Sequence, residues 1–477
     1  MSDFSDFIVI KLGGTSQCKK GYDALINYIF NNKLNENYNI IVVLSAISGV
    51  TTLLDKYTMT KDITFIHEIE DLHEELIDSL FQFDGINIDC DITENNRIMF
   101  NDIHDINDID GMQKLFIKKN FLTEWNKLTE LIKNYTNMDD IRKRAEIIGF
   151  GERLSTNIFN SYIKLRQSNT NIHLLNSYKF IKSKKESYKL FPSVEFIGDL
   201  ESFNKEWMKE EYDCSKNNII ILQGFIASSP SGEPLLLGRG GSDTTGSIIA
   251  NMVGAKFYEV WTDVEGIYTA DPRIVNDVKH IESISYELIQ ELAAMGAKVM
   301  HPLSIIPCQL KSIPIYVKST FNVNGKQTKI HTDDFNDICI AIQKNVSVFH
   351  IKSMNMWNSY GFVHDIFRRF AQNQVDVNII TTSQFSISTT TNETNPYVLK
   401  DLEQDLNKDY ETKFVQNCII LSVVSNNVKK IMSKINFETI SSEIIHIGSN
   451  NLSINIVLKE QTNDFIKMIV EKLFNYT

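Results

Sequence analysis

Short apolar runs and glycine-containing polar turns alternate along the first part of the chain. Residues 7–10 (FIVI) and 40–44 (IIVVL) are continuous apolar stretches, which is the pattern of parallel strands buried on both faces. The first run leads into Gly13 and Gly14, and the second leads through a polar turn into a helix that opens at Thr51. This repeated pattern predicts an α/β domain with a mainly parallel sheet sandwiched by helices.

The middle of the chain continues this pattern with one long departure. Residues 218–222 and 256–261 are predicted to form further strands, whereas residues 55–145 have a helical pattern that is polar and rich in Asn and Asp. We interpret residues 55–145 as a helical insertion or lid without a catalytic signal of its own. The polar stretch 323–336 marks the end of the catalytic domain, which is predicted to cover residues 1–335.

The C-terminal part has a different, shorter pattern. Two rounds of strand, helix, strand and strand follow one another, and they predict two related α+β modules at residues 340–410 and 411–477. The predicted strands are 346–351, 377–381, 385–389, 418–424, 443–447 and 452–457, and the predicted helices are 362–373, 427–435 and 463–474.

Composition narrows the class of protein. Of the 477 residues, 43% are hydrophobic and 23% are charged, which is typical of a soluble globular protein. The net charge of −12 argues against general nucleic-acid binding, which needs a basic surface. A local group of lysines and arginines can still hold phosphates within an acidic protein.

The cysteines and the N-terminus bear on the compartment. The six cysteines lie far apart without a CxxC pair, so we expect reduced thiols and neither a zinc site nor a disulfide framework. The N-terminus MSDFSDF is acidic, unlike a signal peptide, and the longest apolar run, residues 40–50, is too short to span a bilayer. We therefore expect a cytoplasmic protein that binds neither nucleic acid nor membrane.

The first candidate for chemistry is the motif KLGGTS, at the carboxyl end of the first predicted strand. Open α/β sheets bind ligands at this edge, and two glycines let the backbone approach a phosphate. Lys11 supplies a charge, and the N-terminus of the helix behind adds positive potential. The spacing differs from GxxxxGK[ST], which disfavours a P-loop enzyme. Taken alone, the motif is explained as well by an ordinary glycine turn.

The segment GRGGSDTT is harder to explain by structure alone. Arg239 carries a guanidinium fork that matches a carboxylate or a phosphate. Ser242 and Asp243 are predicted N-caps of a helix that opens at Thr244. A capped helix with a flexible lead-in accounts for the serine and the aspartate but not for an arginine between glycines.

Three more segments carry candidate residues. In WTDVEGIYTADPR, Tyr268 can stack beside an adenine and Arg273 can reach a phosphate, although Asp-Pro-Arg is also an ordinary turn. In GFGERLS, Glu152 can bind an ammonium group, although a lone glutamate near a helix start is usually a capping residue. In GAKVMHP, Lys298 is a second phosphate candidate, and we interpret His301 as structural.

Together these motifs resemble those of one family. KLGGTS, VVLSAISGVTTLL, GFGERLS, LLGRGGSDTTGSIIA, WTDVEGIYTADPRI and GAKVMHP occur in the order typical of aspartate kinases, which belong to the amino-acid kinase superfamily. The resemblance runs from about residue 7 to the C-terminus, with residues 55–145 poorly matched and Gly246 where alanine is commoner. The C-terminal modules resemble the paired ACT domains of these enzymes. The resemblance implies transfer of the γ-phosphate of ATP to the side-chain carboxylate of aspartate.

The resemblance also implies roles for individual residues. Lys11, Asp243 and Lys298 would be catalytic, with Asp243 orienting Lys11. The residues implied in ATP binding are Lys11, Leu12, Gly13, Gly14, Thr262, Asp263, Tyr268, Arg273, Lys298 and Val299. The residues implied in aspartate binding are Ser45, Thr51, Glu152, Arg239, Gly240, Gly241 and Ser242. Glu152 would bind the α-amine and Arg239 a carboxylate, while Mg²⁺ would be held mostly by phosphate oxygens and water.

The implied reaction needs no general base. The side-chain carboxylate of aspartate has an ordinary pKa of about 3.9, so it is already ionised at neutral pH. The catalytic task is to align two anions and to neutralise charge on the transferring phosphoryl group. The product, 4-phospho-aspartate, is the entry point to lysine, threonine and methionine.

The resemblance extends to an effector site in the C-terminal modules. The implied effector-binding residues are Met356, Ser359, Phe362, Val363, Val377, Asn378, Ser383 and Gln384. Asn378 and Gln384 are neutral amides where lysine-sensitive members carry Asp and Glu, and an amide cannot balance a buried cation. We therefore expect weaker lysine inhibition, a switch to threonine, or insensitivity, unless both amides lie on a solvated loop. ACT pairs usually associate between chains, which implies a homodimer or a dimer of dimers.

Two other functions stay open. A sibling kinase would phosphorylate another acceptor, such as acetylglutamate, glutamate or a nucleoside monophosphate, but the contexts of Arg239 and Glu152 and the ACT-like tail argue against it. A non-catalytic amino-acid sensor would have lost the charges of the site, whereas Lys11, Asp243 and Lys298 are all present.

Overall fold

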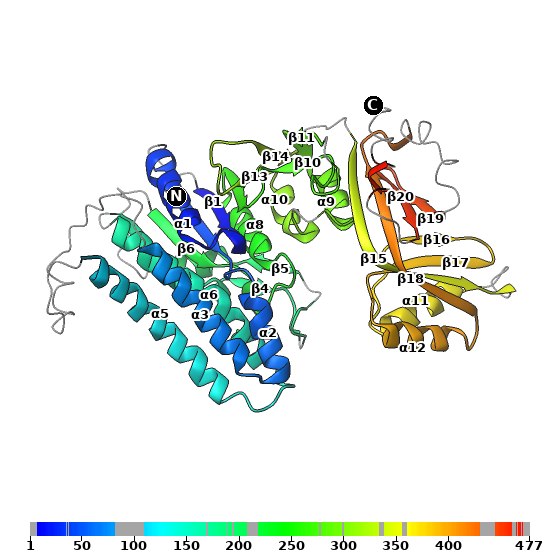
Figure 1. Cartoon of the computed structure of the whole chain (residues 1–477), viewed down its shortest axis with the longest axis horizontal. Helices are drawn as coiled ribbons and strands as arrows, with labels where there is room; N and C mark the ends of the chain where they lie inside the picture. The colour runs from blue at the N-terminus through cyan, green and yellow to red at the C-terminus, as the bar shows by residue number, and fades with distance from the viewer. Residues whose placement is uncertain are drawn as a thin grey trace. The chain divides into compact units, whose positions relative to one another are not determined.

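The protein folds into two compact units. The computed structural model describes residues 7–470 except for residues 35, 37, 82–108, 168–169, 188, 193–194, 208–217, 276–277, 298–299, 333–337, 355–359, 430–443, 460–463, 465 and 469. Residues 1–267 and 303–331 form the N-terminal unit, and residues 268–302 and 332–477 form the C-terminal unit. Figure 1 shows the elements of both. Within this described part of the chain, no helix combines the length and the apolar character that crossing a membrane requires.

The N-terminal unit is built on a mostly parallel sheet. Its strands, in spatial order, are β14 (Gln327–His331), β13 (Ile315–Ser319), β9 (Phe257–Thr262), β1 (Phe7–Leu12), β2 (Asn39–Leu44), β6 (Asn218–Gln223) and β3 (Asn171–Leu175). All neighbouring pairs are parallel except β13 and β14. The predicted fold class is confirmed, and β1, β2, β6 and β9 coincide closely with the apolar runs.

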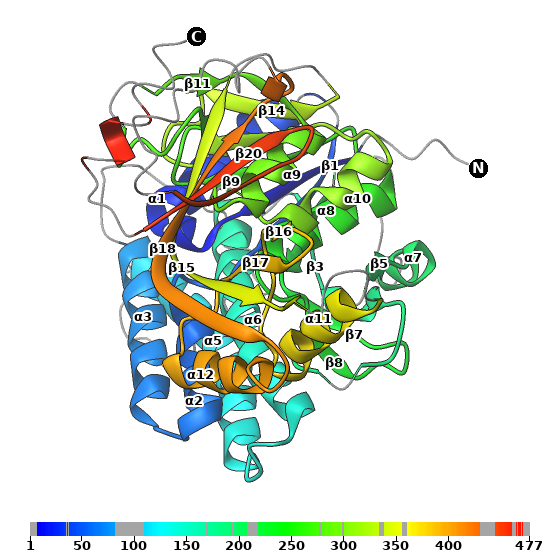
Figure 2. The same ribbon diagram turned by 90° about the vertical axis from the view of Figure 1, so that its right-hand side faces the viewer.

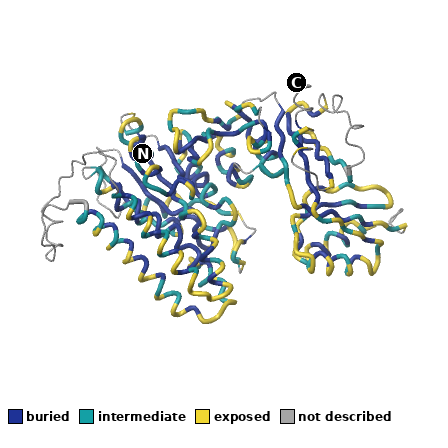
Figure 3. The backbone as a smooth tube through the Cα atoms, viewed as in Figure 1, coloured by how far each residue is buried: buried dark blue, intermediate teal, exposed yellow. Residues whose placement is uncertain are grey.

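These strands supply the main core. Every residue of β1, β2 and β6 is buried, and Figure 3 shows them as continuous buried segments. They share one hydrophobic cluster with α1 (Lys19–Tyr28) and α6 (Ile141–Arg166), while α8 (Gly241–Val253) contacts β1 and β2. Because β2 and β9 flank β1 in parallel, their carboxyl ends meet at one edge of the sheet, where ligands bind in folds of this kind.

The region predicted to be a helical insertion is helical where it is described. α2 (Val50–Thr60), α3 (Thr64–Leu80) and α5 (Ile109–Lys133) pack with α6, and Figures 1 and 2 show these helices running side by side. Phe121 and Trp125 of α5 belong to the same hydrophobic cluster as β1 and β2. The helices therefore extend the core of the sheet.

The apolar runs gave no signal for a second, small sheet in the N-terminal unit. Its order is β5 (Phe196–Gly198), β4 (Ile181–Ser183), β7 (Ile226–Ser228) and β8 (Pro234–Leu236), and α7 (Leu200–Trp207) follows β5. Each of these strands has three residues, which is too short for a periodic pattern to stand out.

The C-terminal unit is built on an antiparallel sheet. The spatial order is β16 (Ile380–Thr382), β17 (Ser386–Thr391), β15 (Cys339–Lys352), β18 (Glu411–Val424), β20 (Ser453–Leu458) and β19 (Ile444–Ser449). β15 and β18 have 14 residues each, about twice the predicted lengths, and their pairing shifts register between Gln343 and Val346. One half of each strand packs in a cluster with α11 (Phe362–Gln372) and α12 (Pro396–Leu406), and the other half packs in a second cluster with β20. Both predicted modules thus share two long strands.

Two details of the C-terminal unit differ from the predictions. α12 was not predicted. β16 begins only at Ile380, whereas the predicted strand covers residues 377–381. Most of the predicted helices 427–435 and 463–474 lie outside the described residues.

A segment from the middle of the sequence belongs to the C-terminal unit. α9 (Tyr286–Ala294) contacts β15 and β18, and the Ile340 N–H donates a 2.7 Å hydrogen bond to the Thr269 carbonyl. Ala270 and Val275 join the hydrophobic cluster of β18 and β20. Parts of this segment, α9 among them, therefore pack on the C-terminal sheet, although they precede β13 in the chain.

Candidate active site

Lys11 and Asp243 form an ion pair at the carboxyl end of β1. Lys11 Nζ lies 2.7 Å from Asp243 Oδ1, and both side chains are mostly buried. Lys11 is near the end of β1, and Asp243 is in the first turn of α8, which contacts β1. The structure thus brings together the two residues that the motifs KLGGTS and GRGGSD placed far apart in sequence.

The turn after β1 is compact because backbones approach it closely. The Gly13 N–H donates a 3.0 Å hydrogen bond to the Trp261 carbonyl, and a Cβ atom on Gly14 would lie 2.9 Å from the Ala46 carbonyl oxygen. A side chain at Gly14 would therefore displace the loop after β2. The turn continues as a short 3₁₀ helix, and α1 begins only at Lys19, later than the predicted helix directly behind the glycines.

Glu152 is the most deeply buried charged candidate. Glu152 is 3% exposed, and its Oε2 has no hydrogen-bond partner among the described residues. Burial raises the pKa of this carboxyl to about 8. A hydrogen bond from the Ala46 N–H acts in the opposite direction but is the smaller effect. Glu152 lies in the middle of α6, whose N-cap is Asp140, so its interpretation as a capping residue near a helix start is wrong.

The loop after β2 packs directly on this part of α6. Ser155 Oγ donates a 2.7 Å hydrogen bond to the Ser45 carbonyl, and a Cβ atom on Gly151 would lie 3.0 Å from Ala46 Cβ. Thr51 is half-buried in the first turn of α2, which follows the same loop. A buried carboxylate without a cation is costly, so this corner favours a ligand that carries an ammonium group.

The glycine-rich loop before α8 differs from its prediction. α8 begins at Gly241 with Gly240 as N-cap, so Ser242 and Asp243 lie inside the first turn and neither side chain caps it. Gly240 has φ +66°, a conformation that glycine adopts readily, which explains why a capping side chain was not needed to end the loop. The Gly241 backbone packs against the Phe225 ring, leaving no space for a side chain.

Arg239 is exposed at the tip of this loop. It forms no ion pair or hydrogen bond with any residue that the structure describes. Its guanidinium group is therefore available to an anionic ligand, whereas Asp243, four residues later, is already paired with Lys11.

Thr262 and Asp263 follow β9, next to β1. The Thr262 carbonyl accepts a 2.8 Å hydrogen bond from the Thr320 N–H, and Thr262 Oγ1 donates a 3.1 Å bond to Asp263 Oδ1. Asp263 is exposed. Since β1 and β9 are parallel neighbours, Thr262 belongs to the same edge of the sheet as Lys11 and Gly13.

Comparison with known proteins identifies the family. Residues 6–319 match the family model described as "Amino acid kinase family". The chain belongs to the amino acid kinase family. It is 26% identical to lysine-sensitive aspartokinase 3 of Escherichia coli over 443 residues, which cover 89% of this chain and 88% of that protein. It is also 26% identical to chloroplastic aspartokinase 2 of Arabidopsis thaliana, covering 70% of this chain and 64% of that protein.

A solved structure shows the same fold. The crystal structure of E. coli aspartokinase III in complex with aspartate and ADP aligns with a TM-score of 0.74 at 22% identity. The alignment covers 98% of this chain and 99% of that chain. The chain therefore shares the fold of that protein over nearly its whole length.

The remaining predicted ATP-binding residues of this amino acid kinase lie in its C-terminal unit. The Tyr268 ring meets the His280 ring edge to face, with centroids 5.4 Å apart. The Arg273 guanidinium pairs with Asp271 at 2.8 Å, and the Arg273 N–H also donates to Asp271, as in an ordinary turn. Lys298 and Val299 lie outside the described residues.

The predicted effector residues lie on loops and at the start of α11. Phe362 packs on the cluster of α11 and α12, whereas Val363, Ser383 and Gln384 are exposed. Val377 is half-buried in the same cluster. Asn378 is exposed, and its Nδ2 donates a 3.0 Å hydrogen bond to Asn392 Oδ1. Met356 and Ser359 lie outside the described residues.

Sequence reasoning missed a buried polar cluster on β9. Glu259 is 4% exposed and accepts hydrogen bonds of 2.6 Å from Tyr28 Oη and 2.8 Å from Trp261 Nε1. Lys318 of β13 lies 4.0 Å from Glu259 and 4.4 Å from the Tyr28 ring centroid. The signal available in the sequence was a charged residue inside an apolar strand, Glu259 in FYEVW. This cluster connects α1 to β9 and β13, strands whose carboxyl ends lie at the candidate active site.

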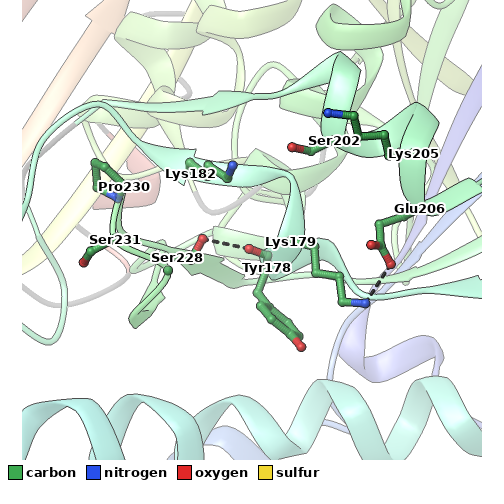
Figure 4. Close-up of a pocket in the computed structure, with 10 residues that line it drawn as sticks. Tyr178, Lys179, Lys182, Ser202, Lys205, Glu206, Ser228, Pro230 and Ser231 are labelled. Carbon is green, nitrogen blue, oxygen red and sulfur yellow. Dashed lines mark hydrogen bonds and ion pairs between the residues drawn. The ribbon is translucent and has the colours of Figure 1, made fainter.

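A groove beside α7 lies apart from these residues. It has a volume of about 550 Å³ and is lined by Tyr178 and several lysines and serines (Figure 4). Lys179 pairs with Glu206 at 2.7 Å and Lys182 with Asp199 at 3.2 Å, and Lys205 pairs with Glu201. Because its lysines are already neutralised, the groove offers no free charge to a phosphate, and we do not assign it a ligand.

Proposed function

We propose that this amino acid kinase is an aspartate kinase that transfers the γ-phosphate of ATP to the side-chain carboxylate of L-aspartate. The product is 4-phospho-L-aspartate, the first step toward lysine, threonine and methionine. The observation that carries the proposal is the buried Glu152, whose Oε2 has no hydrogen-bond partner in the described part of the chain. Such a carboxylate suits the α-ammonium group of an amino acid, which acetylglutamate and nucleoside monophosphates lack.

The proposed aspartate site consists of residues around that carboxylate. Glu152 would bind the ammonium group and the exposed Arg239 a carboxylate. The other proposed contacts are Ser45, Thr51, Gly240, Gly241 and Ser242. Ser45 lies against α6 through Ser155, and Ser242 is in the first turn of α8, which supports placing both near Glu152 and Lys11 respectively.

The proposed ATP site lies at the ends of β1 and β9. The residues proposed at this edge of the sheet are Lys11, Leu12, Gly13, Gly14, Thr262 and Asp263, and the further residues proposed for ATP binding are those predicted from the sequence, Tyr268, Arg273, Lys298 and Val299. A solved relative binds aspartate and ADP, which supports the assignment. We propose that Mg²⁺ would be held mostly by phosphate oxygens and water, as is usual for that ion.

The proposed mechanism is alignment and charge neutralisation. The aspartate carboxylate attacks the γ-phosphorus of ATP, the bond to the bridging oxygen breaks, and ADP leaves with that electron pair. Lys11, held by Asp243, would counteract the charge on the transferring phosphoryl group, together with Lys298. No proton has to be removed from the nucleophile.

We further propose feedback regulation by an amino acid, lysine or threonine, through the C-terminal unit, in a homodimer or a dimer of dimers. The effector contacts would be those predicted from the sequence. The name of the lysine-sensitive E. coli relative supports an amino-acid effector. Asn378 and Gln384 are both exposed, so the argument from an unbalanced buried cation does not apply to them, and their lack of charge does not decide between lysine and threonine.

ATP-dependent hydroxamate formation tests the proposed activity. Aspartate, glutamate and acetylglutamate are offered in parallel with ATP and Mg²⁺. We expect product with aspartate only, lowered at least about 100-fold by Lys11→Ala, because a charge that meets the transition state is lost. Lys20→Ala removes an exposed lysine of α1 and should retain full activity. Product with another acid would mean a sibling kinase, and no product in folded protein would favour a non-catalytic sensor.

A further inference from the structure

Tyr258 is a buried residue that connects the sheet to the first turn of α8. It has no exposed surface, and it lies on β9 opposite Val9 of β1. Its hydroxyl donates a 3.0 Å hydrogen bond to the backbone carbonyl of Asp243. The strand that carries Lys11 and the strand that carries Tyr258 are therefore neighbours, and both contact the turn that carries Asp243.

Gly246 provides the space that Tyr258 occupies. A Cβ atom on Gly246 would lie 2.6 Å from Cζ and from Cε2 of Tyr258, closer than real atoms approach. The ring cannot move aside easily because it is fully buried and its backbone is fixed in a central strand. Glycine inside a helix is unfavourable by itself, so a packing reason is required, and the Tyr258 ring supplies one.

The first turn of α8 is held by bonds within itself and by bonds from two neighbouring segments. Its N-cap is Gly240, and no side chain caps the first N–H groups. Thr245 Oγ1 accepts a 3.0 Å hydrogen bond from the Phe225 N–H, which holds the far side of the same turn. On the side that faces β9, the turn is held by the hydrogen bond that the Tyr258 hydroxyl donates to the Asp243 carbonyl.

We propose that Tyr258 is a positioning residue for phosphoryl transfer, and that Gly246 is its matched counterpart. The Tyr258 hydroxyl fixes the first turn of α8, so that the Asp243 carboxylate holds Lys11 in place. The proposal rests on the proposed kinase function. Tyr258 contacts the Asp243 backbone and acts through Asp243. Because Lys11 counteracts charge that grows in the transition state, the effect falls on kcat and leaves KM nearly unchanged.

Tyr258→Phe tests the positioning role. We expect kcat to fall about tenfold, because small displacements of catalytic groups are costly, while KM for aspartate and ATP changes less than about twofold. Tyr162→Phe is the matched control. Tyr162 is 2% exposed, and its hydroxyl donates a 2.6 Å bond to Asp23 of α1, away from α8. The control should retain kcat. An unchanged kcat in Tyr258→Phe would overturn the proposal.

A second experiment tests the matched pair without using activity. Thermal unfolding is measured for Gly246→Ala, Tyr258→Val and the double variant, with valine chosen because it suits a strand. We expect Gly246→Ala to lower Tm sharply and the double variant to unfold at a higher temperature than Gly246→Ala alone. Strictly additive changes would show that the two residues are not coupled. An inactive wild type would overturn the kinase function, whereas this cycle would still decide the pairing.

Discussion

Glu152 shows how much a single residue depends on its surroundings. In the sequence it is one glutamate among many, whereas in the fold it is buried against the Ser45–Ala46 turn with a raised pKa. The motif GFGERLS singled out this residue for an ammonium-binding role, which stays a prediction. Its burial and its missing partner came from α6 packing on the loop after β2, which lies about 100 residues away in the chain.

We expect aspartate binding to depend on pH through Glu152. With a pKa of about 8, the carboxyl of the free site is mostly protonated at pH 7, and it must release its proton to bind an ammonium group. KM for aspartate should fall as pH rises from 6 toward 8 and then level off. Calorimetry at pH 7 in phosphate and in Tris should show the release of roughly one proton per aspartate bound.

Glu152→Gln is the control for this dependence. It should bind aspartate weakly at every pH and release no proton, and proton release in this variant would assign the titration to another group. Without aspartate, Glu152→Gln should have a higher Tm than the wild type at pH 8.5. The difference in Tm has this sign because the pKa of Glu152 in the folded wild type is raised above its usual 4.5. The wild type therefore loses folding stability as the pH rises toward and through 8, whereas glutamine does not titrate.

At the scale of elements, the packing of helix α3 against α5 encloses a buried histidine whose pKa is shifted. His73 of α3 is fully buried, its ring stacks on Phe121 of α5 with centroids 5.5 Å apart, and Nδ1 contacts the Ile69 carbonyl at 2.6 Å. Nε2 is buried without a hydrogen-bond partner among the described residues. Burial lowers the pKa of His73 to about 4.

We expect the N-terminal unit to lose stability in mild acid because of His73. Between its usual pKa of 6.5 and about 4, the unfolded chain binds a proton that the folded chain does not. At pH 5 the loss relative to pH 7.5 should be about 2 kcal/mol from this group. Urea unfolding followed by helical circular dichroism measures it at both pH values.

His73→Leu should remove most of this difference, because leucine does not titrate and leaves no buried ring nitrogen. His67→Gln changes an exposed histidine of the same helix and should keep the wild-type difference. Equal pH dependence in the wild type and in His73→Leu would contradict the assignment.

At the scale of the whole molecule, the segment 268–302 links two predicted functions within the C-terminal unit. Gly296 lies two residues before Lys298, and a Cβ atom on it would be 3.2 Å from Gln343 Cβ. Gln343 Nε2 contacts Asn392, which also accepts the hydrogen bond from Asn378. Gly296, which precedes Lys298 in the chain, is therefore connected through the side chains of Gln343 and Asn392 to the proposed effector residue Asn378.

We expect Gly296→Ala to raise KM for ATP at least about tenfold and to leave KM for aspartate unchanged. Alanine is strained at φ +105° and would press on Gln343, so the turn before Lys298 would shift. Initial-rate kinetics with each substrate varied separately measure both constants. Gly232→Ala has similar strain at φ +89° in open space and should change neither KM. Equal effects on both substrates would argue against a specific role for this turn.

The sequence by itself determined the local features of this protein. The apolar runs predicted β1, β2, β6 and β9 because a strand buried on both faces must be apolar at every position. The motifs singled out Lys11 and Asp243 because glycines and charges at strand ends are informative over a few residues. These features depend on neighbouring residues and are therefore visible in the order of amino acids.

Only the tertiary structure decided which distant groups meet. The burial of Glu152, the fit of Tyr258 against Gly246, and the packing of α9 onto the C-terminal sheet all arise from contacts between segments far apart in the chain. The lengths of β15 and β18 likewise follow from pairing with several partners, which extends each strand beyond its apolar run. Burial and pairing are properties of the packed molecule, since they depend on which surfaces exclude water together.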